Sequence, residues 1–185
     1  MKIFTLIFFF TTFSYSQISE SGQDKLYDLH VELGMSLYKH YQTDSLNKIM
    51  KNFQTAIEMR PKEPFAFEMR GFIKEELGDF RGAMRDFNKC ILNDPEYIDC
   101  YNSRALLKGS LKDWKGAALD FEKVLELFKK RNIDTFGIIE YADIVYNIAV
   151  CKLNSGELEA ACILFSKAGE LGKFQAYTEI QKHCN

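Results

Sequence analysis

A motif that returns every 34 residues constrains this sequence more than any other feature. Seven positions of one copy reappear in the next copy, mostly with aromatic residues opposite aromatic residues and small residues opposite small ones. They are Phe67, Arg70, Gly71, Ala83, Phe87, Cys90 and Pro95, followed by Tyr101, Arg104, Ala105, Ala117, Phe121, Val124 and Lys129. A repeat of this length is typical of a helix–turn–helix unit that stacks on copies of itself. The sequence therefore predicts an extended surface rather than a catalytic pocket.

The same pattern extends in both directions and predicts four helical hairpins. Phe53, Phe87, Phe121 and Phe165 mark the second helix of each hairpin, at spacings of 34, 34 and 44 residues. The longer last spacing indicates a ten-residue insertion before the fourth hairpin, and the turn of the first hairpin is widened by three residues. The expected bounds of the hairpins are 27–63, 64–97, 98–131 and 142–173, with the insertion at 132–141 and a capping helix and tail at 174–185.

Packing explains why these positions hold these residue types. Two helices that cross closely need a small residue at each contact, and large rings fill the space between stacked hairpins. The small positions of the first helices are Gly34, Gly71, Ala105 and Ala149. The turn positions expected to cap the second helices are Ser45, Asp79, Asp113 and Glu157. Apolar anchors are expected directly after them, at Leu46, Phe80, Trp114 and Leu158.

These residues resemble the tetratricopeptide repeat, whose pattern combines an aromatic residue, a Leu-Gly pair, an A-x3-F segment and a closing proline. The matching residues are Leu33, Gly34, Phe67, Gly71, Ala83, Phe87, Ala117, Phe121, Ala161, Phe165, Pro61 and Pro95. No copy has tryptophan in the first aromatic position, and the third and fourth copies lack the proline. The resemblance implies an all-α fold, a right-handed superhelical array of antiparallel helix hairpins (an α-solenoid) with a C-terminal capping helix.

The resemblance also implies a binding face. In this family the first helices of successive hairpins line a concave face, where a peptide or partner helix binds. The residues that this places in the groove are Met35, Phe65, Glu68, Met69, Phe72, Asn102, Leu106, Tyr146 and Asn147. Apolar residues near acidic ones favour a ligand that is apolar and basic. The alternative is that Phe65 and Phe72 belong to hairpin packing, while the acids only keep the surface soluble.

The first sixteen residues have the layout of a secretory signal peptide. Lys2 precedes a short apolar run over 3–10, and the small residues Ser14 and Ser16 stand at the usual cleavage spacing. A membrane anchor is the alternative, but crossing a bilayer takes about 20 apolar residues. The Ser-x-Ser-Gln ending resembles exported proteins of Bacteroidetes-type bacteria. The sequence predicts export after cleavage, to the periplasm or beyond, with no membrane insertion of the mature chain.

Five cysteines in an exported chain raise the question of disulfides, and an odd number cannot pair completely. Cysteine is also a good small core residue, and reduced buried thiols are the favoured interpretation. At least one disulfide is the alternative, with two candidate pairs, Cys90–Cys100 and Cys151–Cys162. No C-x2-C pair occurs, and the three histidines are not spaced with the cysteines as zinc ligands are, so no metal site is expected.

Composition and motifs narrow the class of function. The formal net charge is −2 and no basic patch stands out, so nucleic acid is not expected as a partner. The sequence contains none of the common catalytic or cofactor-binding motifs, and neither enzymatic activity nor a cofactor is predicted. Two functions stay open. One is an exported adaptor that binds a protein or peptide, and the other is a structural, self-associating subunit with contacts through its ends or through 132–141.

Overall fold

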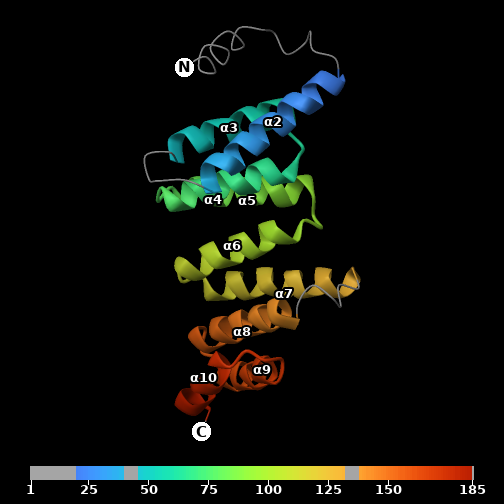
Figure 1. Ribbon diagram of the computed structural model, residues 1–185. Helices are drawn as coiled ribbons and strands as arrows, with labels where there is room; N and C mark the ends of the chain where they lie inside the picture. Colours follow the sequence, from blue (N-terminus) through green and yellow to red (C-terminus); the bar gives the residue numbers. More distant parts are fainter. Residues whose placement is uncertain (1–19, 40–45, 132–137, 185) are drawn as a thin grey trace.

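The computed structural model describes residues 20–39, 46–131 and 138–184, and every regular element in these ranges is an α-helix (Figure 1). The helices are α2 (Glu20–Lys39), α3 (Leu46–Met59), α4 (Pro64–Glu76), α5 (Phe80–Asn93), α6 (Ile98–Ser110), α7 (Trp114–Lys130), α8 (Ile138–Asn154), α9 (Leu158–Glu170) and α10 (Gln175–His183). None of these helices has the combined length and apolarity that crossing a bilayer requires.

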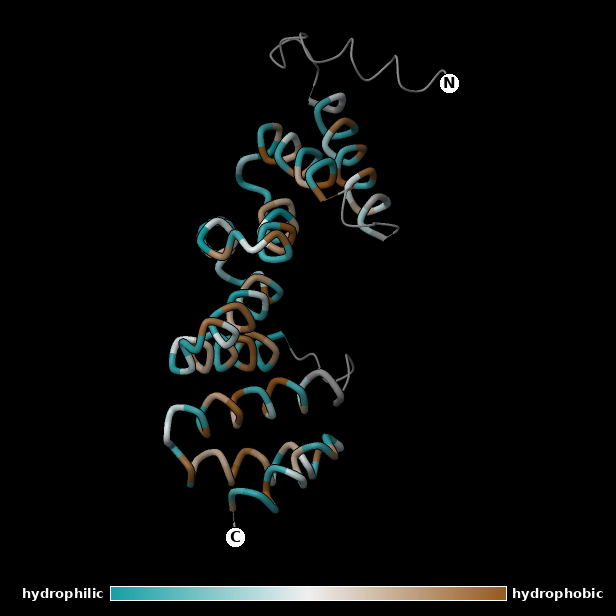
Figure 2. The backbone as a smooth tube through the Cα atoms, turned by 90° about the vertical axis from the view of Figure 1, so that its left-hand side faces the viewer, coloured by the Kyte–Doolittle hydropathy of each residue, from teal (hydrophilic) through white to brown (hydrophobic). Residues whose placement is uncertain are grey.

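Consecutive helices pack on one another and build an elongated stack. The hairpins are α2–α3, α4–α5, α6–α7 and α8–α9, and α10 packs on α9 at the C-terminal end (Figure 2). Helix α4 also contacts α6, the first helix of the next hairpin. The predicted fold class, an all-α array of helix hairpins closed by a C-terminal helix, is confirmed.

Part of the insertion before the fourth hairpin belongs to helix α8. Helix α8 begins at Ile138, four residues before the expected boundary, and both α7 and α8 are 17 residues long. Apolar residues at the end of the insertion therefore extend α8. Residues 132–137 lie outside the described residues, as do the leader at 1–16 and the widened first turn at 41–43.

The core follows the predicted alternation of large and small residues. Phe53, Phe87 and Phe165 have no exposed surface, and Phe121 is 2% exposed. A Cβ atom built on Gly71 would lie 2.7 Å from the ring of Phe87, closer than real carbon contacts allow. The same contact recurs between Gly34 and Phe53, at 2.9 Å. Glycine is thus present because the ring occupies the volume that a side chain would need.

Two of the predicted caps form, and a third does not. Asp79 accepts a hydrogen bond from the amide of Gly82 at 2.8 Å, and Asp113 accepts one from Gly116 at 3.0 Å. Glu157 makes no such bond to the start of α9, because its longer side chain reaches Lys152 and Ser155 instead. The expectation of apolar anchors after the caps is also wrong in part. Phe80 is 42% exposed and Leu158 is 48% exposed, although Leu46 is buried.

A buried charged cluster joins the two helices of the second hairpin, and sequence reasoning missed it. Asp86 on α5 is 4% exposed. It accepts two hydrogen bonds from the guanidinium of Arg70, including one from Nε at 2.8 Å, and pairs with the ammonium of Lys74 at 2.7 Å. Arg70 also donates to Gln54 on the preceding hairpin. The cluster therefore ties α4 to its own partner helix and to the hairpin before it.

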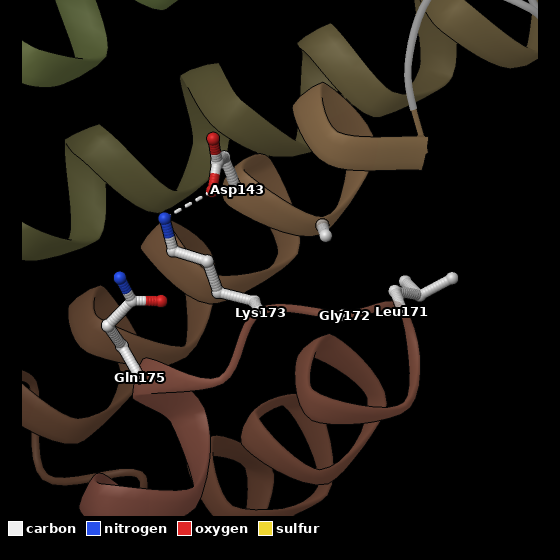
Figure 3. Close-up of a pocket in the computed structure, with 6 residues that line it drawn as sticks. Asp143, Leu171, Gly172, Lys173 and Gln175 are labelled. Atoms are coloured by element: carbon white, nitrogen blue, oxygen red, sulfur yellow. Dashed lines mark ion pairs between the residues drawn. The ribbon is translucent and has the colours of Figure 1, made fainter.

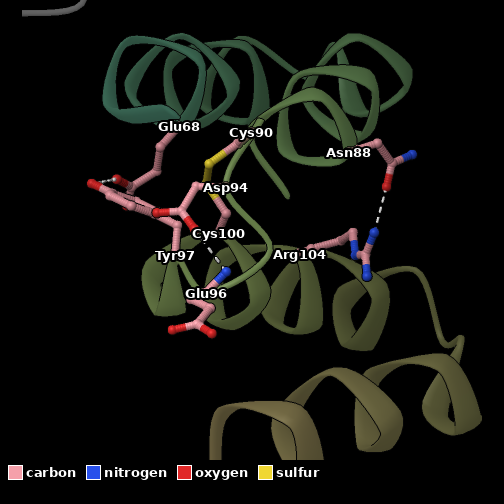
Figure 4. Close-up of a disulfide and its surroundings, with 8 residues drawn as sticks. All are labelled: Glu68, Asn88, Cys90, Asp94, Glu96, Tyr97, Cys100 and Arg104. Carbon is pink, nitrogen blue, oxygen red and sulfur yellow. Dashed lines mark hydrogen bonds between the residues drawn. A yellow bond between two sulfur atoms is a disulfide. The ribbon is translucent and has the colours of Figure 1, made fainter. Parts of the chain in front are cut away.

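The third hairpin repeats this cluster residue for residue, 34 positions later. Asp120 accepts two hydrogen bonds from Arg104, at 2.8 and 2.6 Å, and pairs with Lys108 at 2.7 Å. Arg104 donates to Asn88 on the preceding hairpin at 2.6 Å (Figure 4). The aspartates recur at the same 34-residue spacing as the arginines, but the spacing alone did not show that the two columns face each other.

Two disulfides join neighbouring elements. Cys90–Cys100 links the end of α5 to the start of α6 and so connects the second and third hairpins. Cys162–Cys184 links α9 to the residue after α10. The candidate pair Cys151–Cys162 is wrong, because Cys162 bonds to Cys184 while Cys151 stays a free thiol. Cys151 is buried between α7 and α8, and burial raises the pKa of its thiol to about 11. The favoured interpretation, reduced thiols, is therefore wrong for the other four cysteines, which form the two disulfides.

Candidate peptide-binding surface

Helix α4 carries four of the predicted groove residues, and its two rings also take part in packing. Phe65 lies edge-on to the buried ring of Phe53, with ring centres 6.5 Å apart. Phe72 meets Tyr38 of α2 edge-on at 5.6 Å. All of these α4 side chains except Glu68 belong to the apolar cluster that joins the first two hairpins, and none is fully buried. The rings therefore serve hairpin packing and still leave part of their surface on this face.

Glu68 stands at the junction of α4 and α6, beside a second carboxylate. The hydroxyl of Tyr97 donates to Glu68 Oε2 at 3.1 Å (Figure 4). Burial raises the pKa of Glu68 to about 7, and the negative charge of Asp99 on α6 adds to this rise, while the hydrogen bond from Tyr97 opposes it. Burial and the neighbouring Glu68 also raise the pKa of Tyr97, so the phenol stays a donor. The carboxylate of Glu68 is thus partly desolvated and has no cation to offset its charge.

The basic side chains of α4 form no ion pair with Glu68 or Asp99. Arg70 and Lys74 of the same helix are both engaged by Asp86. Two turns beyond Glu68, burial and then the charge of Glu76 raise the pKa of Glu75. Among the residues that the structure describes, Glu68, Glu75 and Asp99 form no ion pair within 4 Å. This part of the surface therefore holds acidic groups without a paired cation beside half-buried apolar side chains.

The remaining predicted groove residues are spread over three helices. Met35 on α2 is 38% exposed and Leu106 on α6 is 50% exposed, so both offer apolar area to solvent. Asn102, also on α6, is half-buried.

Tyr146 and Asn147 lie on α8, away from the α4 group. Tyr146 packs against Phe165 at 5.5 Å between ring centres and belongs to the apolar cluster of the fourth hairpin. Asn147 is half-buried beside it in the sequence. The structure thus brings the α4 residues together with neighbours on α2 and α6, and keeps the α8 pair with the fourth hairpin.

A shallow hollow adjoins the α8 residues and was not foreseen. It has a volume of about 300 Å³ and is lined by Ala142, Asp143, Leu171, Gly172, Lys173 and Gln175 (Figure 3). Lys173, in the turn between α9 and α10, pairs with the carboxylate of Asp143. Its ammonium also lies 5.6 Å from the ring centre of Tyr146. Tyr97 does not occupy a repeat column, and Lys173 stands in the column of the closing proline, 44 residues after Lys129, where the residue type gives no sign of a binding role.

Within the described part of the chain, no three His, Cys, Asp or Glu side chains are grouped so that they could hold a metal ion.

Comparison with known proteins identifies the repeat unit. Residues 66–97, which form most of the second hairpin, match the tetratricopeptide repeat family. This segment is one repeat of the array. The match covers α4 and α5, the helices that carry Phe65, Glu68, Met69 and Phe72 or pack beneath them. No curated protein matches the chain.

Solved structures show the same fold at low sequence identity. PilF of Pseudomonas aeruginosa superposes with a TM-score of 0.65 at 16% identity, over 82% of this chain and 64% of its own. The TPR2B domain of yeast Sti1, solved with pHsp70, gives a TM-score of 0.62 at 16% identity, over 70% of this chain and 98% of its own. YrrB, a TPR protein with an unusual peptide-binding site, gives 0.63 at 17%, over 78% and 68%. This chain therefore spans less than two thirds of PilF, and the likeness establishes the fold.

Proposed function

We propose that this chain is an exported protein–protein interaction module that binds a peptide or helical segment of an envelope or secreted partner. The segment lies on the face formed by α2, α4 and α6 and continues toward α8. It is apolar, with at least one lysine or arginine. The observation that carries this proposal is the pair Glu68 and Asp99, two carboxylates beside apolar side chains and without a cation of their own.

Electrostatics explains why a cation from the partner fits here. A half-buried carboxylate has already lost part of its hydration, so an incoming ammonium or guanidinium restores a favourable interaction without a large new desolvation penalty. Met69, next to Glu68 in the sequence, and Phe72, one turn further, supply apolar area on the same helix. Two similar structures support the class of ligand, since the Sti1 domain was solved with pHsp70 and YrrB has a peptide-binding site.

Export rests on two independent features of the chain. The leader at 1–16 has the layout of a signal peptide. The disulfides Cys90–Cys100 and Cys162–Cys184 are bonds that persist in oxidising compartments such as the periplasm or the extracellular space. Comparison of the mature N-terminus and the redox state of protein from the periplasm and from the medium tests this part of the proposal. An uncleaved chain with five free thiols would overturn it.

A binding titration tests the ligand. The probe is a fluorescent amphipathic peptide made of leucine and lysine, and its partner probe replaces lysine with glutamate. The double variant Glu68→Gln and Asp99→Asn is expected to lose about tenfold in affinity for the lysine peptide, since a desolvated charge contact is worth about 1.4 kcal/mol or more. The matched control, Glu159→Gln with Glu170→Gln, removes two exposed acids of α9 and keeps the affinity.

The apolar half of the site is tested separately. Met69→Asp with Phe72→Asp is expected to abolish capture of the natural partner from an envelope fraction, provided that circular dichroism shows a folded array. Recovery of the same partners by this folded variant, or equal binding of the lysine and glutamate peptides, would disprove the proposed site.

A structural role is the second candidate, and one observation favours it. Leu29 and Leu33 of α2 are 55% and 37% exposed. Leu29 stands 37 residues before Ala66, which has no exposed surface because the preceding hairpin covers it. The N-terminal end of the array therefore shows an apolar face that interior hairpins bury. Light scattering after size-exclusion chromatography separates the two functions, because a monomer at all concentrations contradicts self-association.

A further inference from the structure

The two disulfides differ in how well the fold shields them. Cys90 and Cys100 have no exposed surface. Cys162 and Cys184 are both half-buried, at the end of the array. A thiolate must reach a sulfur atom to reduce a disulfide, so access decides which bond is attacked first. The bond between Cys162 and Cys184 is therefore the one open to reduction while the protein stays folded.

This bond fastens the shortest helix of the described chain. Helix α10 has nine residues and is held by contacts with α9. Ala176 is its only fully buried residue, and the ring of Tyr177 lies over Gly169. A helix of this length is not stable in water by itself, so its position depends on tertiary contacts and on the covalent link. Loss of the link leaves only a small contact area to hold α10 in place.

The turn before α10 carries the cation at the C-terminal end of the proposed groove. Lys173 pairs with Asp143 of α8 (Figure 3). Its ammonium also lies over the ring of Tyr146. With α10 in place, the charge of Asp143 is offset by a residue of the chain itself. If α10 and its turn move away, Asp143 becomes a free carboxylate next to a predicted groove residue.

We propose that the Cys162–Cys184 disulfide is a redox-sensitive latch that sets the charge of the groove at its C-terminal end. A dithiol reductant gives two electrons and two protons to the bond, which yields thiols on Cys162 and Cys184 and a disulfide in the reductant. The opened latch loosens α10 and its turn and withdraws Lys173 from Asp143. The effect on ligand affinity rests on the proposed function, because a more acidic face binds a basic segment more tightly.

The latch itself is tested without any ligand. The wild-type protein is incubated with increasing dithiothreitol, alkylated and mapped by mass spectrometry. Cys162 and Cys184 are expected to be alkylated at lower reductant concentrations than Cys90 and Cys100. Hydrogen exchange is then expected to accelerate over 171–183 in the variant Cys162→Ser with Cys184→Ser, and not in Cys90→Ser with Cys100→Ser. If the first variant does not fold, the partly reduced wild type provides the same measurement.

The coupling to the groove is tested with the leucine–lysine peptide. Opening the latch is expected to raise its affinity by about twofold to fivefold, the range of a partly exposed ion pair. Lys173→Met is expected to give the same rise in the oxidised protein. Reduction of both disulfides together, or unchanged exchange over 171–183, overturns the latch. Unchanged affinity in both variants overturns its coupling to the groove. If the oxidised wild type does not bind the peptide, the proposed function fails, while the exchange result still decides the latch.

Discussion

The second and third hairpins differ from the fourth in what lies between their helices. Arg104 and Asp120 form a buried charged cluster in the third hairpin. The positions 44 residues later hold Ile148, which is 3% exposed, and Leu164, which packs in the same apolar region. The equivalent positions between the two helices of a hairpin are thus filled by charged side chains in the third hairpin and by apolar side chains in the fourth.

This difference between the hairpins shows how the relative position of two packed helices is fixed. A bidentate pair between arginine and aspartate satisfies all its partners only when the two helices stand in one relative position, because a shift by one turn leaves buried charges unpaired. An apolar pair imposes no such condition and relies on shape. Lys152 of α8 and Glu122 of α7, 3.8 Å apart, join the fourth hairpin to the third and occupy the cluster positions that remain polar there. The central hairpins therefore carry a positional constraint that the fourth hairpin lacks.

The largest effect is expected from removing one member of a cluster. Asp120→Ala leaves Arg104 and Lys108 without their shared counter-ion in a buried place, and should lower the free energy of unfolding by about 3–5 kcal/mol. Urea denaturation followed by circular dichroism measures this. The control is Glu126→Ala, which breaks an exposed ion pair with Lys123 and should change stability by less than about 1 kcal/mol.

Replacing the charged cluster of the third hairpin with apolar residues like those of the fourth hairpin tests this comparison. Arg104→Ile, Lys108→Met and Asp120→Leu together exchange the charged cluster for apolar side chains, and should restore stability to within about 1 kcal/mol of the wild type. A triple variant as unstable as Asp120→Ala would show that the two kinds of contact are not interchangeable.

The next effect concerns the Cys90–Cys100 disulfide, which joins the second hairpin to the third. Cys90→Ala with Cys100→Ala opens a short loop between the second and third hairpins, and should cost about 2–4 kcal/mol. Thermal unfolding in the absence of reductant measures the loss. The variant and the wild type, both fully reduced, should show no further difference, whereas a clear gap between them would point to packing damage.

A smaller gain is expected at the turn of the third hairpin. Lys112 has a φ of 64°, and the corresponding turn positions of the second and fourth hairpins hold Gly78 and Gly156, with φ of 79° and 87°. A left-handed conformation is unfavourable for lysine and free for glycine. Lys112→Gly should therefore raise stability by about 1 kcal/mol, measured by urea denaturation, while Lys115→Gly, inside α7, should lower it.

The last effect is a pH dependence of stability that belongs to the second hairpin. The pKa of Glu68 rises from 4.5 to about 7 on folding, so the folded state binds this proton more tightly than the unfolded state does. Stability is therefore expected to fall as pH rises from about 4.5 to 7. Glu68→Gln should flatten this part of the stability curve. The equivalent positions are Asn102 and Tyr146, so a matching dependence in the Gln variant would have to come from elsewhere.

Part of the fold and of the candidate site could be predicted from the sequence, because the repeated positions reflect packing that every hairpin shares. Phe87 and Gly71 stand in fixed columns and meet as expected. Residues outside the columns were missed, however close they lie to functional positions. Tyr97 reaches Glu68 from a loop, and Cys184 reaches Cys162 from the last residues of the chain. The error over Cys151 has the same origin, since equal distance from a turn does not say which face of a helix a side chain occupies.

The sequence by itself determined the hairpins, their number and their buried rings, because a 34-residue period can be read from residue types alone. Tertiary structure alone decided which charges are paired and which are left over. Arg70 and Lys74 pair with Asp86, so Glu68 on the same helix is left without a cation. Side-chain direction depends on the neighbours that folding brings together, and a one-dimensional pattern does not contain them.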